Sequence, residues 1–309
     1  MTDKYITVIG GINADIIGTP EKRPVMHDSN PGSNTLYPGG VGRNIAENCA
    51  KLGIKTKLLS SIGNDYFGQF IQDATKHPNM DLSNLIISDK HNTSTYVCLN
   101  DENGDIHYAV NDMLVTELIT PEYIESKLEL INNSAAIVID TNIPVETIKY
   151  ICENVTVPII ADTVSENKAP KLMTVMNKLY AVKVNLLEAE LMSGIHINNF
   201  YDAKDAAFKL QDKGIKNVFL TMGSNGVTYC GDLEAGILPA YKIKSVNTAG
   251  CGDAFTAAMV YGYINGLSAK KTALCGLACA ALTLATEKTV SDEISPEAIS
   301  RIIEEDNIL

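Results

Sequence analysis

The sequence is short of positive charge. It holds 25 lysine and arginine residues against 37 aspartate and glutamate residues, which gives a formal net charge of -12 at pH 7. Proteins that bind a nucleic-acid backbone usually carry the opposite balance, so we exclude nucleic acid as a partner. A small anionic ligand stays open, because it needs only local positive potential.

Long apolar runs are also missing. No stretch reaches the roughly 18 apolar residues that a membrane span needs, and the N-terminal MTDKYITVIGG has no signal-peptide pattern. The seven cysteines form no disulfide framework, and Cys275 and Cys279 are interpreted as small core residues rather than metal ligands. We therefore expect a cytoplasmic protein with reduced thiols and no membrane partner.

Three common nucleotide-binding or catalytic motifs are absent as well. The glycine-rich stretches that start at Gly40 and Gly250 lack the last glycine of the dinucleotide-binding fingerprint. The sequence contains neither the P-loop Gly-x-x-x-x-Gly-Lys-Ser/Thr nor the Gly-x-Ser-x-Gly nucleophile elbow. None of these familiar motifs therefore explains the glycine-rich turns of the chain.

The chain does contain a regular alternation of short apolar runs and amphipathic segments. The amphipathic segments at 42–53 and 201–214 each end at a glycine, a common helix C-cap. The apolar runs predict strands that are buried on both faces, at residues 5–10, 56–63, 135–140, 157–162, 180–185 and 217–223. We therefore predict an α/β fold, with a doubly wound, mostly parallel sheet and helices on both faces.

Two stretches break this alternation. Residues 14–37 hold three prolines, and residues 93–116 have a hairpin pattern that turns at Asn103-Gly104. We expect these two stretches to form a small β-sheet lid that excludes water from a reaction; ordinary surface excursions are the alternative. The remaining α/β core then comprises residues 1–13, 38–92 and 117–309.

Polar side chains and glycines follow the first predicted strand and open the first predicted helix. Asn13 and Asp15 come directly after that strand, at the edge of the sheet where ligands bind in this fold class. They can hydrogen-bond a polyhydroxylated ligand, or they can simply shape a turn. Gly39 and Gly40 allow the backbone to approach a ligand closely, and Asn44 lies in the first turn of the helix.

Two further patterns follow later strands. Asn185 and Glu188 offer an amide oxygen and a carboxylate, which suit Mg²⁺ held partly through waters. A helix start with acidic residues in its first turn explains the same pattern equally well. Thr221, Gly223 and Gly226 offer a hydroxyl and backbone amides for phosphate oxygens, with a plain β-turn as the alternative.

A lone carboxylate stands at the start of a predicted helix in the stretch NTAGCGDAF, residues 247–255. Asp253 can be a simple helix cap, because a helix N-terminus favours negative charge. It can also be a general base beside an anion that the preceding Gly250, Cys251 and Gly252 bind. Combined with the metal and phosphate patterns, this stretch favours phosphoryl transfer to a hydroxyl group.

The stretch 39–44 and the stretch 247–255 resemble, in order and spacing, the two signatures of the ribokinase-like (PfkB) carbohydrate kinases, and the resemblance covers the whole chain. It implies ATP and Mg²⁺ as cofactors, together with roles for individual residues. These roles are catalysis by Asp253 with Gly250, Cys251 and Gly252 as the anion hole; ATP binding by Lys183, Asn185, Thr221, Gly223, Gly226, Gly250 and Gly252; Mg²⁺ binding by Asn185 and Glu188; and sugar binding by Asn13, Asp15, Gly39, Gly40 and Asn44.

Some positions refine this resemblance. Asn247 stands where the family often has an aspartate, which leaves a monovalent-cation site open. Segment 27–53 is similar to bacterial pseudouridine kinases, which implies phosphorylation of the 5′-hydroxyl of pseudouridine. Asn111, Asp112 and Asn142 are then expected to read the base, with hairpin polarity as the alternative for the first two.

Two other interpretations of the function stay open at this point. The acceptor can be another nucleoside, ribose or a related sugar, and a non-catalytic sugar or nucleoside sensor is the alternative from a different class. The resemblance also implies a homodimer that forms through the lid. An intact Asp253 argues against the sensor, because a sensor needs no base.

Overall fold

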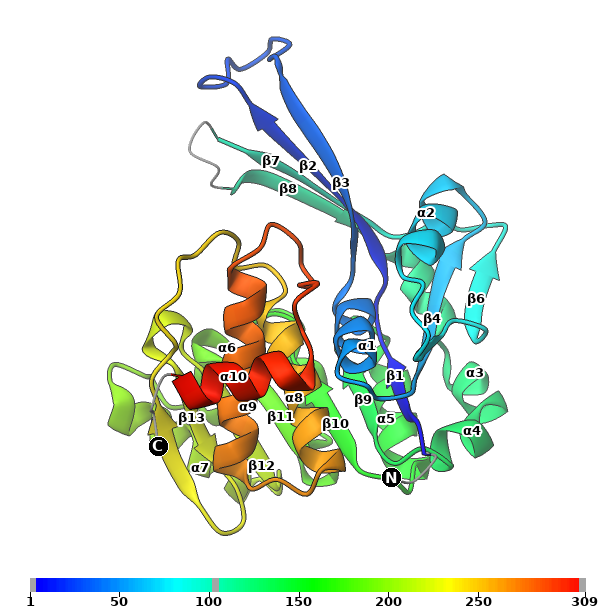
Figure 1. Ribbon diagram of the computed structural model, residues 1–309. Coiled ribbons are helices and arrows are strands. Elements are labelled where there is room, and N and C mark those ends of the chain that lie inside the picture. The colour runs from blue at the N-terminus through cyan, green and yellow to red at the C-terminus, as the bar shows by residue number, and fades with distance from the viewer. Residues whose placement is uncertain (1–3, 102–105, 306–309) are drawn as a thin grey trace.

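The protein consists of an α/β body from which a small sheet projects (Figure 1). The computed structural model describes residues 4–101 and 106–305. The turn expected at Asn103-Gly104 lies outside the described residues.

Ten strands form the main sheet in the described part of the chain. Their order is β14-β13-β12-β11-β10-β9-β1-β4-β5, and β6 also pairs with β4. All neighbours from β12 to β5 are parallel, whereas β13 and β14 add to the far edge in antiparallel orientation. The bounds are β1 Ile6–Ile9, β4 Thr56–Gly63, β5 Met80–Asp81, β6 Leu85–Ser88, β9 Ile137–Asp140, β10 Ile159–Asp162, β11 Ala181–Asn185, β12 Asn217–Thr221, β13 Val227–Cys230 and β14 Ala235–Leu238.

Helices cover both faces of this sheet, which confirms the predicted doubly wound fold. Buried residues of α1, α8, α9 and α10 pack on one face, and those of α3 to α7 pack on the other. The bounds are α1 Val41–Lys51, α2 Tyr66–Ala74, α3 Pro121–Ser126, α4 Leu128–Asn132, α5 Val145–Asn154, α6 Leu186–Ser193, α7 Phe200–Asp212, α8 Cys251–Ile264, α9 Ala269–Leu284 and α10 Pro296–Glu305. Short 3₁₀ helices are η1 Leu114–Leu118, η2 Ala169–Leu172, η3 Met176–Lys178 and η4 Gly223–Asn225.

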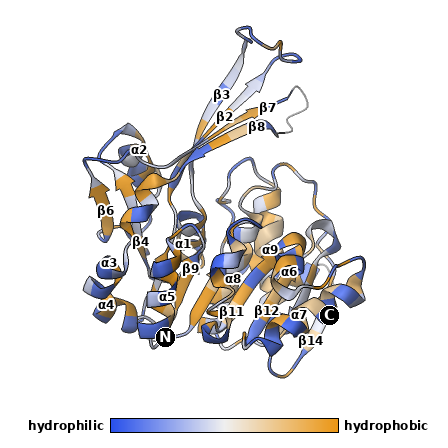
Figure 2. Ribbon diagram, turned by 180° about the vertical axis from the view of Figure 1, so that it is seen from behind, coloured by the Kyte–Doolittle hydropathy of each residue, from blue (hydrophilic) through white to orange (hydrophobic). Residues whose placement is uncertain are grey.

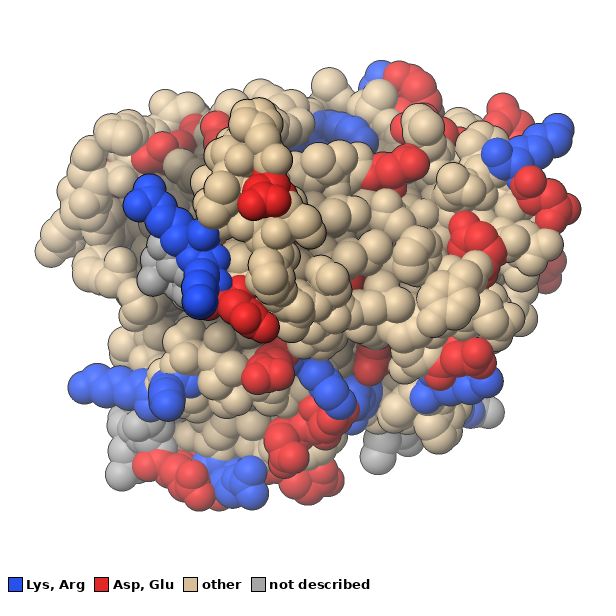
Figure 3. Space-filling model, turned by 90° about the horizontal axis from the view of Figure 1, so that it is seen from above, with Lys and Arg blue, Asp and Glu red and all other residues tan. Residues whose placement is uncertain are grey.

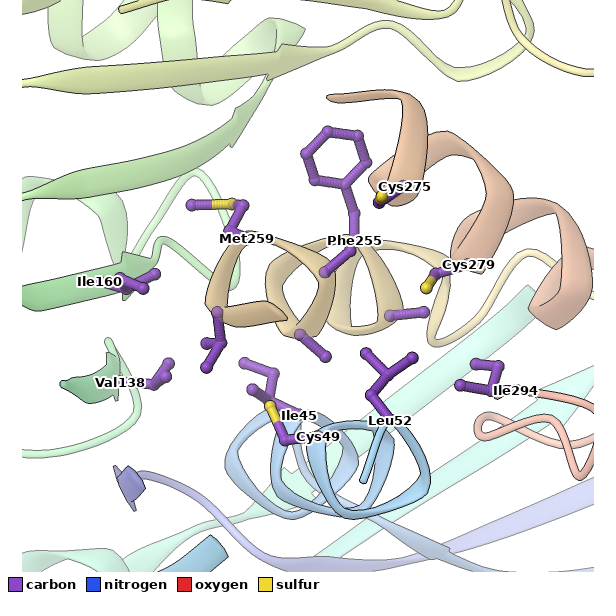
Figure 4. Packing of buried hydrophobic residues seen from close by; sticks show 14 of the residues in the cluster. Ile45, Cys49, Leu52, Val138, Ile160, Phe255, Met259, Cys275, Cys279 and Ile294 are labelled. Carbon is purple, nitrogen blue, oxygen red and sulfur yellow. The ribbon is translucent and has the colours of Figure 1, made fainter. Parts of the chain in front are cut away.

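The core between α1, α8 and α9 fixes the two helices that start at the site described below. Ile45 and Cys49 of α1 point toward α8, Phe255 and Met259 extend from the opposite side of α8, and Cys279 of α9 lies beside the same helix (Figure 4). All five side chains are buried. Burial of apolar side chains contributes about 1.5–3 kcal/mol each, so the relative position of α1 and α8 is strongly determined.

The projecting sheet has four described strands in the order β3-β2-β7-β8. They are β2 Asn13–Pro20, β3 Gly32–Gly39, β7 Thr95–Asn100 and β8 Ile106–Asp112. Two antiparallel pairs, β2 with β3 and β7 with β8, are joined by a parallel pairing of β2 with β7. The sheet rises above the carboxyl ends of the main strands (Figure 1), and both segments that break the sequence alternation contribute to it.

Polar residues end several of the parallel strands at the same edge of the main sheet. Asp140 ends β9, Asp162 ends β10, Asn185 ends β11 and Thr221 ends β12. The strand interiors are apolar, as the orange strands in Figure 2 show. In open α/β sheets this edge is where ligands bind, so the fold gathers the candidate residues on the side that faces the projecting sheet.

The charged surface agrees with the low content of basic residues. Viewed from above, basic and acidic side chains are interspersed among neutral ones, without a broad field of either sign on that face (Figure 3). In the ranges 4–101 and 106–305, no helix is long and apolar enough to cross a membrane.

Candidate active site

The two signature segments of the sequence meet at one hydrogen bond. Asn44 lies in the first turn of α1, and Asp253 lies in the first turn of α8. The side-chain amide Nδ2 of Asn44 donates to Oδ2 of Asp253 at 2.6 Å. Only 5% of Asn44 and 8% of Asp253 are exposed. Among the residues that the structure describes, none donates a hydrogen bond to Oδ1, the other carboxylate oxygen of Asp253.

The surroundings of Asp253 raise its pKa. Burial, together with the nearby charge of Asp162, raises its pKa to about 8, while the hydrogen bond from Asn44 and the charge of Lys183 act in the opposite direction. A carboxylate with a pKa near neutrality accepts a proton more readily than an exposed one. A plain helix cap would need no such environment, because a surface carboxylate fulfils that role.

The turn before Asp253 exposes backbone amides at the start of α8. Gly250 is the residue before the helix and has a φ of 82°, and a Cβ there would collide with the carbonyl oxygen of Thr289. The first amides of a helix have no acceptor within it. The Cys251 amide donates instead to the Thr248 carbonyl at 3.4 Å, and the Gly252 amide is available to an anion. The Cys251 thiol donates to the Ala280 carbonyl at 3.5 Å, and burial raises its pKa to about 11.

Asn247 organises the same turn. Its Oδ1 accepts a hydrogen bond from the Ala249 amide at 3.0 Å, and its Nδ2 donates to the Glu287 carbonyl at 2.9 Å. An aspartate could make only the first of these bonds, because it has no N–H group. The structure therefore gives Asn247 a defined role in holding the turn.

A buried ion pair lies beneath the start of α8. The Lys183 ammonium is 3.1 Å from Oδ1 of Asp162, and Thr256 donates to the other carboxylate oxygen at 2.7 Å. A Cβ on Gly252 would lie 3.0 Å from Nζ of Lys183. The lysine therefore lies against the backbone that the sequence assigns to the anion hole, where its charge adds to that of the helix N-terminus.

Asn185 and Glu188 form a capping box at the start of α6. The Glu188 carboxylate accepts from both nitrogens of Asn185 at 2.8 Å and from the Thr163 hydroxyl, and the Glu188 amide donates to Asn185 Oδ1. Glu188 is fully buried, whereas Asn185 is exposed. The helix-start alternative is thus present in the structure.

The residue types of this pair are ones that Mg²⁺ takes as ligands, although each of their side-chain oxygen atoms already accepts a hydrogen bond. A single carboxylate and an exposed amide suit an ion that keeps several waters and takes its other ligands from phosphates. Among the described residues no group of three His, Cys, Asp or Glu side chains could hold a metal. A metal carried by the capping box alone would therefore be held weakly and would depend on a phosphate ligand.

The loop between β12 and β13 is a tight turn. The Met222 amide donates to the Gly226 carbonyl at 2.8 Å, and the Gly226 amide donates to the Gly223 carbonyl at 3.0 Å. Thr221 donates its hydroxyl to the Val184 carbonyl at 3.3 Å. The loop lies at the carboxyl end of β12, beside β11 and Asn185, so it shares the edge with the capping box.

Asn13 and Asp15 start the projecting sheet. Nδ2 of Asn13 donates to Oδ1 of Asp15, and burial raises the pKa of Asp15 to about 6 despite that bond. Gly39 lies opposite Asn13 in the β2–β3 pair, and a Cβ on Gly39 would collide with the Asp15 carboxylate. Two polar groups and a bare backbone thus converge at the base of the sheet.

The glycines before α1 let two backbones cross at close range. A Cβ on Gly40, which has a φ of 97°, would lie 2.5 Å from the carbonyl oxygen of Gly11. A Cβ on Gly42 would lie 2.7 Å from the carbonyl carbon of Gly10. The start of α1 therefore rests directly on the turn that follows β1.

The turn after β9 presents Asn142. The Asp140 carboxylate is fully buried and accepts from the amides of Gly11 and Asn142, each at 2.8 Å. Lys168 donates to Oδ1 of Asn142 at 2.5 Å. Asp140 thereby ties the turn after β1 to the turn after β9, and it orients Asn142 beside Gly11.

The structure places Asn111 and Asp112 on opposite faces of the projecting sheet, because successive strand residues alternate. Asn111 pairs with Tyr96, which pairs with Asp15, so these three residues share one face. Asp112 lies on the opposite face, and its Oδ1 accepts a hydrogen bond from the Leu114 amide at 3.1 Å. The expectation that both residues read one base does not fit this register, and Asn111 alone lies on the face of Asp15.

Sequence reasoning did not identify several buried polar residues of the site. Asp140 and Asp162 end predicted strands, and that position alone could have marked them. Thr256 lies one turn after Asp253 on α8, a spacing that places both on one face. Lys168 had no such signal, because it lies in a loop outside the predicted elements.

Comparisons with known proteins agree with this geometry. The model of the pfkB family carbohydrate kinases matches residues 3–296. The pseudouridine kinase of Escherichia coli is 34% identical over 97% of this chain and 96% of its own length. A putative sugar kinase from Clostridium perfringens has a TM-score of 0.87 at 28% identity, covering 99% of this chain and 97% of that one.

A more distant structure shows the same fold. The Arabidopsis thaliana ribokinase complexed with ribose and ATP has a TM-score of 0.85 at 20% identity, with 97% of this chain and 99% of that chain covered. The fold is therefore ribokinase-like. The chain belongs to the pfkB family of carbohydrate kinases, phosphotransferases that act on a hydroxyl group.

Proposed function

We propose that the protein transfers the γ-phosphoryl group of ATP to the 5′-hydroxyl of pseudouridine. The observation that carries this proposal is the contact between Asn44 and Asp253, which brings both signature segments around one buried carboxylate. The choice of pseudouridine is supported by the similarity to the E. coli enzyme over nearly the full length of both chains.

The reaction follows from the groups around α8. Asp253 accepts the proton of the acceptor hydroxyl while the new O–P bond forms and the bond to the β-phosphate oxygen of ATP breaks. The amides of Gly250 and Gly252 and the ammonium of Lys183 stabilise negative charge on the transferring group. Mg²⁺, when bound, would neutralise charge on the ATP phosphates, with Asn185 and Glu188 holding it through water.

The nucleotide and the acceptor are assigned to different parts of the site. Thr221, Gly223 and Gly226 are proposed to contact ATP, because they lie at the same sheet edge as Asn185. Asn13, Asp15, Gly39, Gly40 and Asn44 are proposed to hold the ribose hydroxyls. Asn142 and Asn111 are proposed to contact the base, because Asn142 lies against Gly11 and Asn111 lies on the Asp15 face.

We propose that the four-stranded sheet is a lid over the acceptor, distinct from the core of residues 1–13, 38–92 and 117–309. The lid would exclude water and so protect ATP from hydrolysis. Its outer face carries Val97, Leu99, Tyr108 and Val110, which are 37%, 52%, 58% and 70% exposed. These residues pair across β7 and β8, and we propose that they form a homodimer contact.

One experiment tests the acceptor. ATP consumption would be measured with pseudouridine, uridine, inosine, adenosine, ribose and fructose 6-phosphate at equal concentrations. We expect the highest kcat/KM with pseudouridine. Equal use of uridine, or a preference for ribose, would refute the pseudouridine assignment while leaving the kinase family intact. A chain that binds these ligands without consuming ATP would instead be a sensor.

A further inference from the structure

Arg43 is a charged side chain buried at the centre of the site, with only 1% of its surface exposed. It lies in the first turn of α1, directly before Asn44. Burying a guanidinium without partners is very costly. The hydrogen-bond partners of the Arg43 guanidinium therefore indicate which groups this residue holds in place. None of the roles assigned above uses this residue.

The guanidinium connects three elements. Nε donates to the Gly39 carbonyl of β3 at 3.1 Å, and NH1 forms an ion pair with Glu47 one turn along α1. NH2 donates to Oδ1 of Asn44, and it lies 3.4 Å from the hydroxyl of Thr289. The Thr289 hydroxyl is itself 3.3 Å from Oδ1 of Asn44.

These contacts determine which way the Asn44 amide points. A guanidinium only donates hydrogen bonds, so the group that faces it must be the amide oxygen. The amide nitrogen is then turned toward Oδ2 of Asp253, where the distance is 2.6 Å. An amide held in this orientation can only donate to Asp253, which favours the ionised carboxylate over the protonated one.

We infer that Arg43 is a positioning residue that fixes the Asn44 amide as a donor to Asp253 and thereby keeps the base ready to accept a proton. Without Arg43 the amide could rotate by half a turn and accept a proton from a neutral Asp253. The positive charge of the guanidinium acts in the same direction through space. This inference rests on the proposed role of Asp253 as the base.

Other charges also act on Asp253, and the test has to separate them. Asp162 of β10 and Asp140 of β9 favour its protonated form, whereas Lys183 of β11 favours the ionised form. Cys251 lies on the same helix and interacts with Asp253. In residues 4–101 and 106–305 none of these residues forms a hydrogen bond with Arg43, so substitution of Arg43 leaves their hydrogen bonds in place. Asp15 of β2 also interacts with Arg43 by charge, and loss of that charge would raise the pKa of Asp15 as well.

The experiment compares pH profiles of kcat/KM for the best acceptor at saturating Mg²⁺ and ATP. Arg43→Met removes the charge and the donors but keeps an apolar stem. We expect its acidic limb to move upward by about one pH unit, the size of a single lost charge-assisted hydrogen bond. Glu47→Gln is the matched control, since it removes the ion pair but leaves Asn44 and its donor; its limb should not move upward.

Two results would overturn the inference. One is an unmoved acidic limb in Arg43→Met, and the other is an equal upward shift in Glu47→Gln, which would indicate a merely structural ion pair. If Arg43→Met does not fold, Arg43→Lys decides by the same criterion, because one ammonium cannot serve Gly39, Glu47 and Asn44 together. An active wild type with unchanged variant profiles refutes this inference alone, whereas a wild type that phosphorylates no acceptor refutes the proposed function as well.

Discussion

Thr256 donates a hydrogen bond of 2.7 Å to Asp162, and this contact ties α8 to the end of β10 one helical turn after Asp253. The bond fixes how far the helix approaches the sheet edge. It also places a second carboxylate near Asp253, which is one reason why the pKa of Asp253 is raised. The position and the basicity of Asp253 therefore have a common structural cause.

Replacement of Asp253 by asparagine should abolish base catalysis. The amide keeps the size of the side chain but cannot accept the hydroxyl proton, so we expect kcat to fall by about 10²–10⁴-fold or more. Steady-state kinetics would check this. Asp205→Asn, which changes an exposed carboxylate on α7, is the control and should keep wild-type kcat. Near-native kcat in Asp253→Asn would contradict the assignment.

The same substitution should stabilise the protein at alkaline pH. The folded protein keeps the Asp253 proton up to a pKa of about 8, whereas the unfolded chain releases it near pH 4. The wild type therefore loses stability as the pH rises through this interval, and Asp253→Asn does not. We expect the melting temperature of the variant to exceed that of the wild type at pH 9, with a smaller difference at pH 5.

Wild-type activity should rise with pH through the pKa of the base. Because Asp253 must be ionised to act, kcat/KM should increase about tenfold per pH unit on the acidic side and level off near pH 8. A pH titration of initial rates with saturating Mg²⁺ and ATP would measure this. A flat profile between pH 6 and pH 9 would argue against a base with a raised pKa.

Glu188→Gln separates the two roles of the capping box. Loss of the carboxylate should move the Mg²⁺ requirement to higher concentration, with little change in nucleoside binding. It should also cost about 1 kcal/mol of stability, because one of the hydrogen bonds that the Glu188 carboxylate accepts is lost. Asn185→Ser keeps an N-cap acceptor and is the matched comparison. An unchanged Mg²⁺ requirement in Glu188→Gln would show that Glu188 only caps the helix and does not bind Mg²⁺.

Base recognition can be tested with two neighbouring residues. Pseudouridine has a free ring N–H that uridine lacks, and a site that pairs this group discriminates against a ligand without it. Asn111→Ala should weaken the preference for pseudouridine while ATP binding stays intact. Asp112→Ala, on the opposite face of β8, should leave the preference unchanged. A loss of preference only in Asp112→Ala would show that the lid turns its other face to the acceptor.

The exposed outer face of the lid predicts a change in oligomeric state on substitution. Val110→Asp places a charge among Val97, Leu99 and Tyr108 and should dissociate a dimer. Light scattering coupled to size exclusion would measure the mass. Leu233→Asp changes an apolar residue that is 99% exposed elsewhere and should have no effect. A monomeric wild type would rule out the lid dimer.

The sequence predicted the main sheet well because its strands are buried on both faces. All six predicted strands coincide with β1, β4, β9, β10, β11 and β12 within two residues at each end. Helices α2 to α5 and strands β5, β6 and β14 were not predicted. All three strands are at most four residues long, and β5 and β14 end the strand order of the sheet, where neighbouring elements rather than local pattern decide the conformation.

The site was predicted in part, for a physical reason. Glycines and polar residues next to a strand end or a helix start can be recognised locally, as for Asn44 and Asp253. Partly buried partners such as Lys168 and Thr289 come from distant loops, and only the folded chain brings them to Asn142 and Asn44. The face on which Asn111 lies depends on strand register, which the hairpin pattern alone did not determine.

The crossing of the turn after β1 and the start of α1 has a consequence for how this protein can diversify. Any side chain at Gly40 or Gly42 would overlap the backbone at Gly10 or Gly11. Even the smallest substitution, to alanine, would therefore disturb this crossing. A mutational scan should find that Gly40 and Gly42 tolerate no other residue even under weak selection. We therefore expect new acceptor preferences to arise through substitutions in β8 and in the loop that carries Lys168. Changes there do not disturb the start of α1, which supports Asp253 through Asn44.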